Sequence, residues 1–200
     1  MHKHFCAIAL LLMSVTYADN NEATYEDLAR KASAGDLSID FQALRFACLK
    51  AKSCDAEGDR KQLLAGRKAM HEKDYANAAK IAEGMIAKGF PNIEAQALAA
   101  NAYAALNDGE KAKFHHDVTS ALIQSILKSG DGKSKETAFA VINVHEEYIV
   151  MSVLGLSPMG SQSLITGKPH SYDLLERDEP KSGTKVSVYF LIDAFFPMKL

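Results

Sequence analysis

The chain has 200 residues, of which 24% are charged and 48% are hydrophobic, and its formal net charge at pH 7 is −2. This length is sufficient for one domain, or two small ones, with a buried core. A chain so close to neutral lacks the basic field that non-specific binding to nucleic acid or to an anionic membrane surface requires. We therefore expect neither as a primary partner.

Residues 1–18 have the composition of a cleaved export signal. Lys3 precedes an apolar run from Phe5 to Met13, and Thr16-Tyr17-Ala18 places small residues before a cleavage site after Ala18. The run is too short to cross about 30 Å of hydrocarbon, and no later stretch has the roughly 18 uninterrupted apolar residues of a membrane helix. We expect a soluble mature protein without membrane insertion, either periplasmic or fully secreted.

The segment that follows predicts two short helices. A capping residue at Thr24 and a stop at Gly35 predict a helix over residues 25–34. Asp40 can cap a second helix, in which apolar residues recur at helical spacing through Cys48. This places Cys48 near the edge of the core.

Cys48 and Cys54 are candidates for a structural disulfide. Within one helix they would lie about 9 Å apart, beyond the roughly 7 Å that a disulfide permits. Pairing therefore requires the helix to end near Lys52, and the segment from Ser53 to Gly58 supplies suitable breakers. An exported compartment permits oxidation, so we favour a disulfide over two free thiols. The Cys-x5-Cys spacing, with no flanking His, matches neither a redox motif nor a metal motif.

The middle of the chain repeats at an offset of 34 residues. Lys73-Asp74-Tyr75 and Asn107-Asp108-Gly109 each separate two alanine-rich, helix-periodic stretches, and this offset is the period of a tetratricopeptide (TPR) helix hairpin. Gly66 aligns with Ala100, where small side chains let paired helices approach closely. The alternative is an ordinary alanine-rich bundle, since solenoids usually need three or more repeats. The predicted helices are 59–71, 75–88, 93–106 and 110–128.

After Gly130-Asp131-Gly132 the pattern changes. Residues 138–144 are rich in Val, Ile and Phe, residues 146–154 predict a short helix, and residues 171–177 and 185–192 predict strands. We expect a small antiparallel sheet with one helix packed on it. Because so small a sheet is marginal alone, it should pack on the helical half. The predicted class is α+β, with a TPR-like helical region (19–129) and an α+β region (130–200) in one composite body.

Short motifs along the chain carry a family resemblance. They are Gly130–Ser134 with Thr137-Ala138, Glu146-Glu147-Tyr148, Gly155, His170–Asp173 and Val188-Tyr189-Phe190 with Asp193, preceded by Tyr25–Leu28, Asp40-Phe41 and Leu44-Arg45. With them the chain resembles the bacterial family known as domain of unknown function 4919, whose members also look like short exported proteins. The resemblance spans most of the mature chain, and the Cys48/Cys54 pair looks like a local variation. It implies no activity and therefore no functional residues.

One group of polar residues in the C-terminal region offers side chains for acid–base chemistry. His170 and Asp173 precede or begin a predicted strand, and Lys133, Glu147 and Tyr148 complete the group. These side chains are suited to proton transfer only if the fold brings them together in a cleft.

Other motifs predict no cofactor and no metal. Gly132-Lys133-Ser134 matches the end of a phosphate-binding loop, but Leu127 stands where that loop needs glycine. Gly160–Leu164 fails the Gly-x-Ser-x-Gly pattern of a nucleophile elbow. The adjacent His115 and His116 diverge by about 100° on a helix and cannot readily chelate one ion together. His115 shares a face with apolar residues and is expected to be a half-buried structural histidine.

Two functional hypotheses follow. The leading one is a non-catalytic module whose TPR-like helices form a shallow groove for an unknown protein or peptide, with Asn101 and Lys111 on the helical surface that faces this partner. The alternative is a small hydrolase or ligand-binding protein that uses the polar group of the C-terminal region. It requires those side chains to converge.

Overall fold

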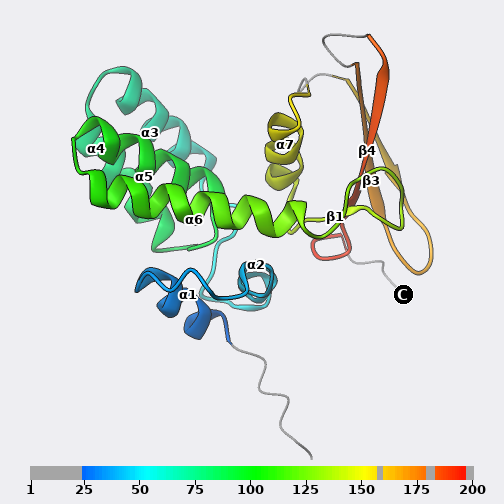
Figure 1. Ribbon diagram of the computed structural model, residues 1–200, viewed down its shortest axis with the longest axis horizontal. Coiled ribbons are helices and arrows are strands. Elements are labelled where there is room, and N and C mark those ends of the chain that lie inside the picture. The colour runs from blue at the N-terminus through cyan, green and yellow to red at the C-terminus, as the bar shows by residue number, and fades with distance from the viewer. Residues whose placement is uncertain (1–23, 157–159, 179–182, 197–200) are drawn as a thin grey trace, which may run out of the picture.

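The computed structural model describes residues 24–156, 160–178 and 183–196. The predicted export signal lies outside these ranges. The helices are α1 (Tyr25–Ser33), α2 (Phe41–Lys50), α3 (Arg60–His71), α4 (Tyr75–Ile86), α5 (Ile93–Ala105), α6 (Gly109–Leu127) and α7 (Val144–Val153). The strands are β1 (Phe139–Ala140), β2 (Ser161–Ile165), β3 (Tyr172–Asp178) and β4 (Lys185–Leu191). Helices dominate the first half and the sheet lies at the C-terminal end, which confirms the predicted α+β class (Figure 1).

Polar side chains fix where the helices begin. Each described helix follows a residue whose side-chain oxygen accepts a hydrogen bond from a backbone N–H two or three residues later. Such a cap stabilises a helix by about 1 kcal/mol relative to alanine. The capping residues are Thr24, Asp40, Asp59, Asp74, Asn92, Asp108 and Asn143.

The two helical hairpins, α3/α4 and α5/α6, repeat the same turn. Lys73 and Asn107, which are 34 residues apart, both have a φ of 61°. Positive φ is uncommon for residues other than glycine. In both turns the next residue, Asp74 or Asp108, caps the second helix. The self-similarity of the sequence therefore corresponds to a structural repeat of a helix hairpin.

Small side chains bring the helices of this half close together. Gly66 of α3 is buried, and a Cβ atom there would collide with the Cδ2 atom of Leu98 on α5. The centre of the bundle is built from buried alanines, and such contacts allow short distances between helix axes. These alanines are Ala78, Ala79 and Ala82 on α4 and Ala95, Ala99 and Ala102 on α5.

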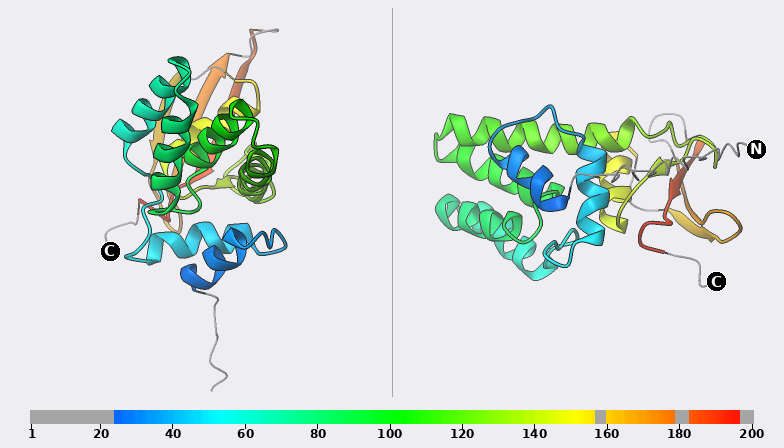
Figure 2. Two further views of the ribbon diagram at one scale, coloured as in Figure 1. Left: turned by 90° about the vertical axis from the view of Figure 1, so that its left-hand side faces the viewer. Right: turned by 90° about the horizontal axis from the view of Figure 1, so that it is seen from below.

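The N-terminal helices α1 and α2 lie beneath the hairpins, where α2 contacts α6 (Figures 1 and 2). Helix α2 ends at Lys50, and the extended conformation of Ala51 turns the chain back. The Cα atoms of Cys48 and Cys54 are consequently 5.3 Å apart, and the two residues form a disulfide. The structure thus contains the predicted pairing.

Removing the disulfide should destabilise the protein modestly. The closed loop is short, so a Cys48→Ala/Cys54→Ala variant should lose about 2 kcal/mol of unfolding free energy through the greater entropy of its unfolded chain. Urea denaturation of both proteins without reductant measures this loss. Adding reductant should then lower the stability of the wild type and leave that of the variant unchanged; equal responses would contradict the prediction.

The sheet has the order β1-β4-β3-β2. Strands β2, β3 and β4 pair antiparallel, whereas β1 pairs in parallel with β4 through Phe139 opposite Phe190. The sheet is therefore mixed, which corrects the prediction of a purely antiparallel sheet. Strand β2 was not predicted, because Ser161, Gln162 and Ser163 show no alternation of apolar and polar residues.

Helix α7 lies between the hairpins and the sheet (Figure 1). One cluster of buried apolar residues includes side chains from α1, from both hairpins, from α7 and from β3 and β4. The helical and sheet regions thus share a core. None of the helices in the described ranges combines the length and apolar character needed to cross a membrane.

Candidate functional site

A buried ion pair joins the helical half to α7. Arg45 on α2 donates from Nε to Oε1 of Glu146 at 2.8 Å and from Nη2 to Oε2 at 2.6 Å. Its Nη1 donates to Oγ of Ser125 on α6, and Nη2 also donates to the carbonyl of Ala140 on β1. The Ile142 N–H donates to Oε2 of Glu146. The guanidinium of Arg45 therefore links α2 to α6, β1 and α7, and it holds the first turn of α7 in place.

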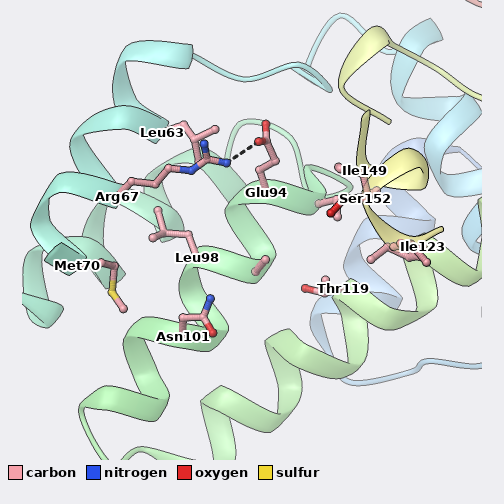
Figure 3. Close-up of a pocket in the computed structure, with 13 residues that line it drawn as sticks. Leu63, Arg67, Met70, Glu94, Leu98, Asn101, Thr119, Ile123, Ile149 and Ser152 are labelled. Atoms are coloured by element: carbon pink, nitrogen blue, oxygen red, sulfur yellow. Dashed lines mark hydrogen bonds and ion pairs between the residues drawn. The ribbon is translucent and has the colours of Figure 1, made fainter. Parts of the chain in front are cut away.

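Beside this junction lies an open groove of about 730 Å³ between α3, α5, α6 and α7 (Figure 3). Its surface is mainly apolar because each of these helices contributes a stripe of aliphatic side chains. The largest are Leu63 and Met70 on α3, Ile93 and Leu98 on α5, Ile123 on α6 and Ile149 on α7. The groove thus uses both hairpins and the helix of the C-terminal region.

The two surface positions predicted to face a partner lie in different places. Asn101 lines the groove on α5 (Figure 3). Lys111 does not line it: its Nζ atom lies 4.7 Å from the ring centroid of Tyr103 and 3.7 Å from a carboxylate oxygen of Asp108.

A charged group reaches one part of the groove wall through Arg67 and Glu94, and its third member, His145, lies just outside the lining. Arg67 on α3 donates from Nη2 to Oε1 of Glu94 on α5 at 2.8 Å, and Nδ1 of His145 on α7 lies 3.0 Å from Oε2 (Figure 3 shows the Arg67–Glu94 pair). The hydrogen bond to Glu94 raises the pKa of His145, and the same bond holds the pKa of Glu94 below its ordinary value. Three elements therefore supply one network of charges.

The polar group predicted in the C-terminal region is only partly assembled. Glu147 on α7 is fully buried, and neither carboxyl oxygen has a hydrogen-bond donor among the described residues. Asp173 on β3 is its neighbour and accepts a bond from Nε2 of Gln162 at 2.9 Å, while the Tyr148 hydroxyl lies 3.5 Å from Oε1 of Gln162. Burial first, and then the negative charge of the neighbouring Asp173, raise the pKa of Glu147 to about 9. At neutral pH Glu147 therefore carries a proton.

The other two members of that group have different partners. Nδ1 of His170 lies 2.5 Å from Oδ2 of Asp193, and the ring packs edge-to-face on Tyr172. Lys133 is exposed and pairs with Asp131 at 3.3 Å. The structure thus links Glu147 and Asp173, directs His170 to Asp193, and leaves Lys133 at the surface.

Further motifs singled out in the sequence have structural roles. The N–H groups of Asp131 and Gly132 donate to the carbonyl of Thr137, so the glycine-rich loop directs them inward. His115 is buried more fully than predicted, and its Nδ1 lies 2.7 Å from Oε1 of Gln96, while burial lowers its pKa. Within the described residues no three His, Cys, Asp or Glu side chains are placed to hold a metal ion.

Sequence reasoning missed the charged group of the groove. Arg67 lies on the same face of α3 as Leu63 and Met70. A charged residue within an otherwise apolar helical stripe is the signal that could have identified it. No comparable signal exists for Glu94 and His145, because their proximity depends on how α7 packs against α5.

Comparison with curated proteins found no match, and comparison with solved structures found none either. A family model described as a domain of unknown function (DUF4919) matches residues 48–199, a span that includes every residue lining the groove. The chain therefore belongs to the DUF4919 family, as the motifs in its sequence predict.

Proposed function

We propose that this protein is a non-catalytic interaction module that binds a segment of a protein or peptide partner in the groove between α3, α5, α6 and α7. The observation that carries the proposal is the groove itself. Its volume of about 730 Å³ falls within the roughly 300–1,000 Å³ typical of ligand sites. Covering its apolar surface would contribute about 25 cal/mol for each Å² removed from water.

The packing around the groove supports a preformed site. Its walls are helices with capped N-termini, and the buried Arg45–Glu146 pair holds α7, which supplies Ile149 to the lining. A site that needs no ordering on binding loses less of its interaction energy. The predicted export signal and the Cys48–Cys54 disulfide support a periplasmic or secreted place of action.

A second candidate function, a hydrolytic or ligand-binding site around Glu147 and Asp173, has one observation in its favour. Buried carboxyl groups without donors, and with a strongly raised pKa, are frequent at active sites. Against it, neither residue lines the groove, and His170 and Lys133 pair with other residues. We therefore rank this function second.

Filling the groove should weaken partner binding. Ala97 lies in the groove on α5, so Ala97→Phe should reduce the affinity of peptides selected on the wild-type protein at least about tenfold, the equivalent of 1.4 kcal/mol. Ala65→Phe is the matched control, because Ala65 is exposed on α3 and does not line the groove. Peptides selected from a displayed random library and measured by fluorescence polarisation provide the readout. Equal affinities for the two variants would exclude the groove as the site.

A further inference from the structure

Two charged residues line the groove, Arg67 and Glu94, and His145 lies beside Glu94 just outside the lining. Arg67 and His145 share the single carboxylate of Glu94. The remaining charged groups that face His145 are Glu57 and Arg60. With His145 protonated, Arg67 and His145 together bear two positive charges against the single negative charge of Glu94, while Arg60 and Glu57 offset each other. Such a wall complements an acidic group on a ligand.

Arg67 has the exposure and the donors to bind that group. Its side chain is 58% exposed, whereas that of Glu94 is 21% exposed, so the guanidinium is the more accessible member of the pair. A guanidinium has five N–H donors. The bond to Glu94 uses one of them, and across the described ranges Arg67 makes no second hydrogen bond. Arginine is also well suited to carboxylates because two of its N–H groups can bind both oxygens.

The surroundings of Arg67 favour an acidic side chain over the carboxylate at the end of a chain. On α3, Leu63 lies one turn before Arg67 and Met70 lies about one turn after it, and both line the groove. Along α5 the lining extends from Ile93 to Asn101, which is about 12 Å. A bound segment thus meets apolar surface on both sides of the charge, and this arrangement suits a residue within the segment.

We propose that the groove binds an internal partner segment in which an aspartate or glutamate is flanked on both sides by apolar residues, with Arg67 bound to its carboxylate. This inference rests on the proposed function and adds the chemical class of the partner. Because protonated His145 offsets the charge of Glu94, which lies beside Arg67 in the groove, the preference for the acidic residue should weaken as the pH rises through the raised pKa of His145 and this group loses its proton.

The test uses pools of synthetic peptides with acetylated N-termini and amidated C-termini. Each pool has a central Glu, Gln or Lys between randomised Ala, Leu, Ile, Val and Phe, and retention on the immobilised full chain is measured by mass spectrometry. We expect the Glu pool to be retained about tenfold more strongly than the Gln pool, because an ionised carboxylate accepts a stronger hydrogen bond from a guanidinium than a neutral amide does. The Lys pool should be retained least.

Two variants assign this preference to Arg67. Arg67→Gln should make the retention of the Glu and Gln pools equal, whereas Lys68→Gln should leave the preference intact. The Lys68→Gln variant loses one positive charge from the same helix, as Arg67→Gln does, but Lys68 pairs with Glu72 and does not line the groove. Thermal unfolding of each variant confirms that it is folded.

The possible failures are distinguishable. Equal retention of the Glu and Gln pools by the wild type would overturn the acidic segment and leave the proposed function in place. Retention that requires a free C-terminal carboxylate, measured with unamidated pools, would overturn the internal position. If no pool is retained and library peptides bind the Ala97→Phe variant normally, both the inference and the proposed function fail.

Discussion

Replacing Arg45 with methionine should lower the free energy of unfolding by about 3–5 kcal/mol, the cost of leaving a buried charge without its partner. Arg45 and Glu146 have side chains that are 0% and 3% exposed, and methionine retains much of the apolar volume of arginine. The loss therefore comes mainly from the carboxylate of Glu146, with smaller contributions from Ser125 and the carbonyl of Ala140. Urea denaturation followed by circular dichroism measures it.

Removing both charges should restore part of this stability. In an Arg45→Met/Glu146→Leu variant neither charge of the pair remains, and what is lost are the hydrogen bonds to the Ile142 N–H, the Ser125 hydroxyl and the Ala140 carbonyl, at about 1 kcal/mol each. Arg67→Met serves as the control, because that arginine is mostly exposed and its ion pair should contribute less than about 1 kcal/mol. Equal losses for Arg45→Met and Arg67→Met would show that the buried pair does not anchor α7.

The helical half could be predicted because its signals are local. The N-caps at Thr24 and Asp40 mark where α1 and α2 begin, and the self-similarity around Lys73 and Asn107 marks two equivalent turns. The disulfide followed from similar reasoning, since the spacing of the cysteines required α2 to end before Cys54. In each case the residues that decide the structure lie within a few positions of one another.

The junction and the groove could not be predicted in this way. Arg45 and Glu146 are 101 residues apart, and the two charged residues that line the groove and their neighbour His145 come from α3, α5 and α7. Strand β1 has two residues, and its parallel pairing is set by its neighbour β4. No local pattern encodes such contacts, because they depend on how distant elements pack.

The polar group of the C-terminal region shows where strand periodicity helps and where it fails. Alternation along β3 puts Asp173 on the same face as the buried Leu175, and this can be read from the sequence. His170 precedes the strand, and its partner is Asp193, beyond the end of β4. The sequence therefore grouped residues that the fold separates.

Replacing Glu147 with glutamine should remove a loss of stability that the wild type undergoes as the pH rises. In the folded chain the pKa of Glu147 is raised from 4.5 to about 9. Between these two values the folded chain holds a proton that the unfolded chain has released, so the stability of the wild type falls as the pH rises. Glutamine has no proton to lose. From about pH 5 to about pH 7 the wild type should therefore lose up to about 3 kcal/mol that the variant keeps.

The measurement is urea denaturation at a series of pH values, with Glu176→Gln as control. Glu176 lies on β3 but alternates with the buried Leu175 and Arg177, so its carboxyl points to the opposite face of the sheet. The control should follow the wild-type dependence on pH, while Glu147→Gln should flatten it. A decline with pH that is as steep in Glu147→Gln as in the wild type would show that Glu147 is not the group responsible.

An Asp173→Asn variant separates the causes of the raised pKa. Burial is the larger cause and persists in this variant, whereas the negative charge of Asp173, the second cause, is removed. The pKa of Glu147 should therefore fall only part of the way toward its ordinary value. Stability should still decline with rising pH, but the decline should end at a lower pH than in the wild type. If it disappeared altogether, the charge of Asp173 rather than burial would dominate, and the interior beside α7 would be more polar than the packing of Glu147 indicates.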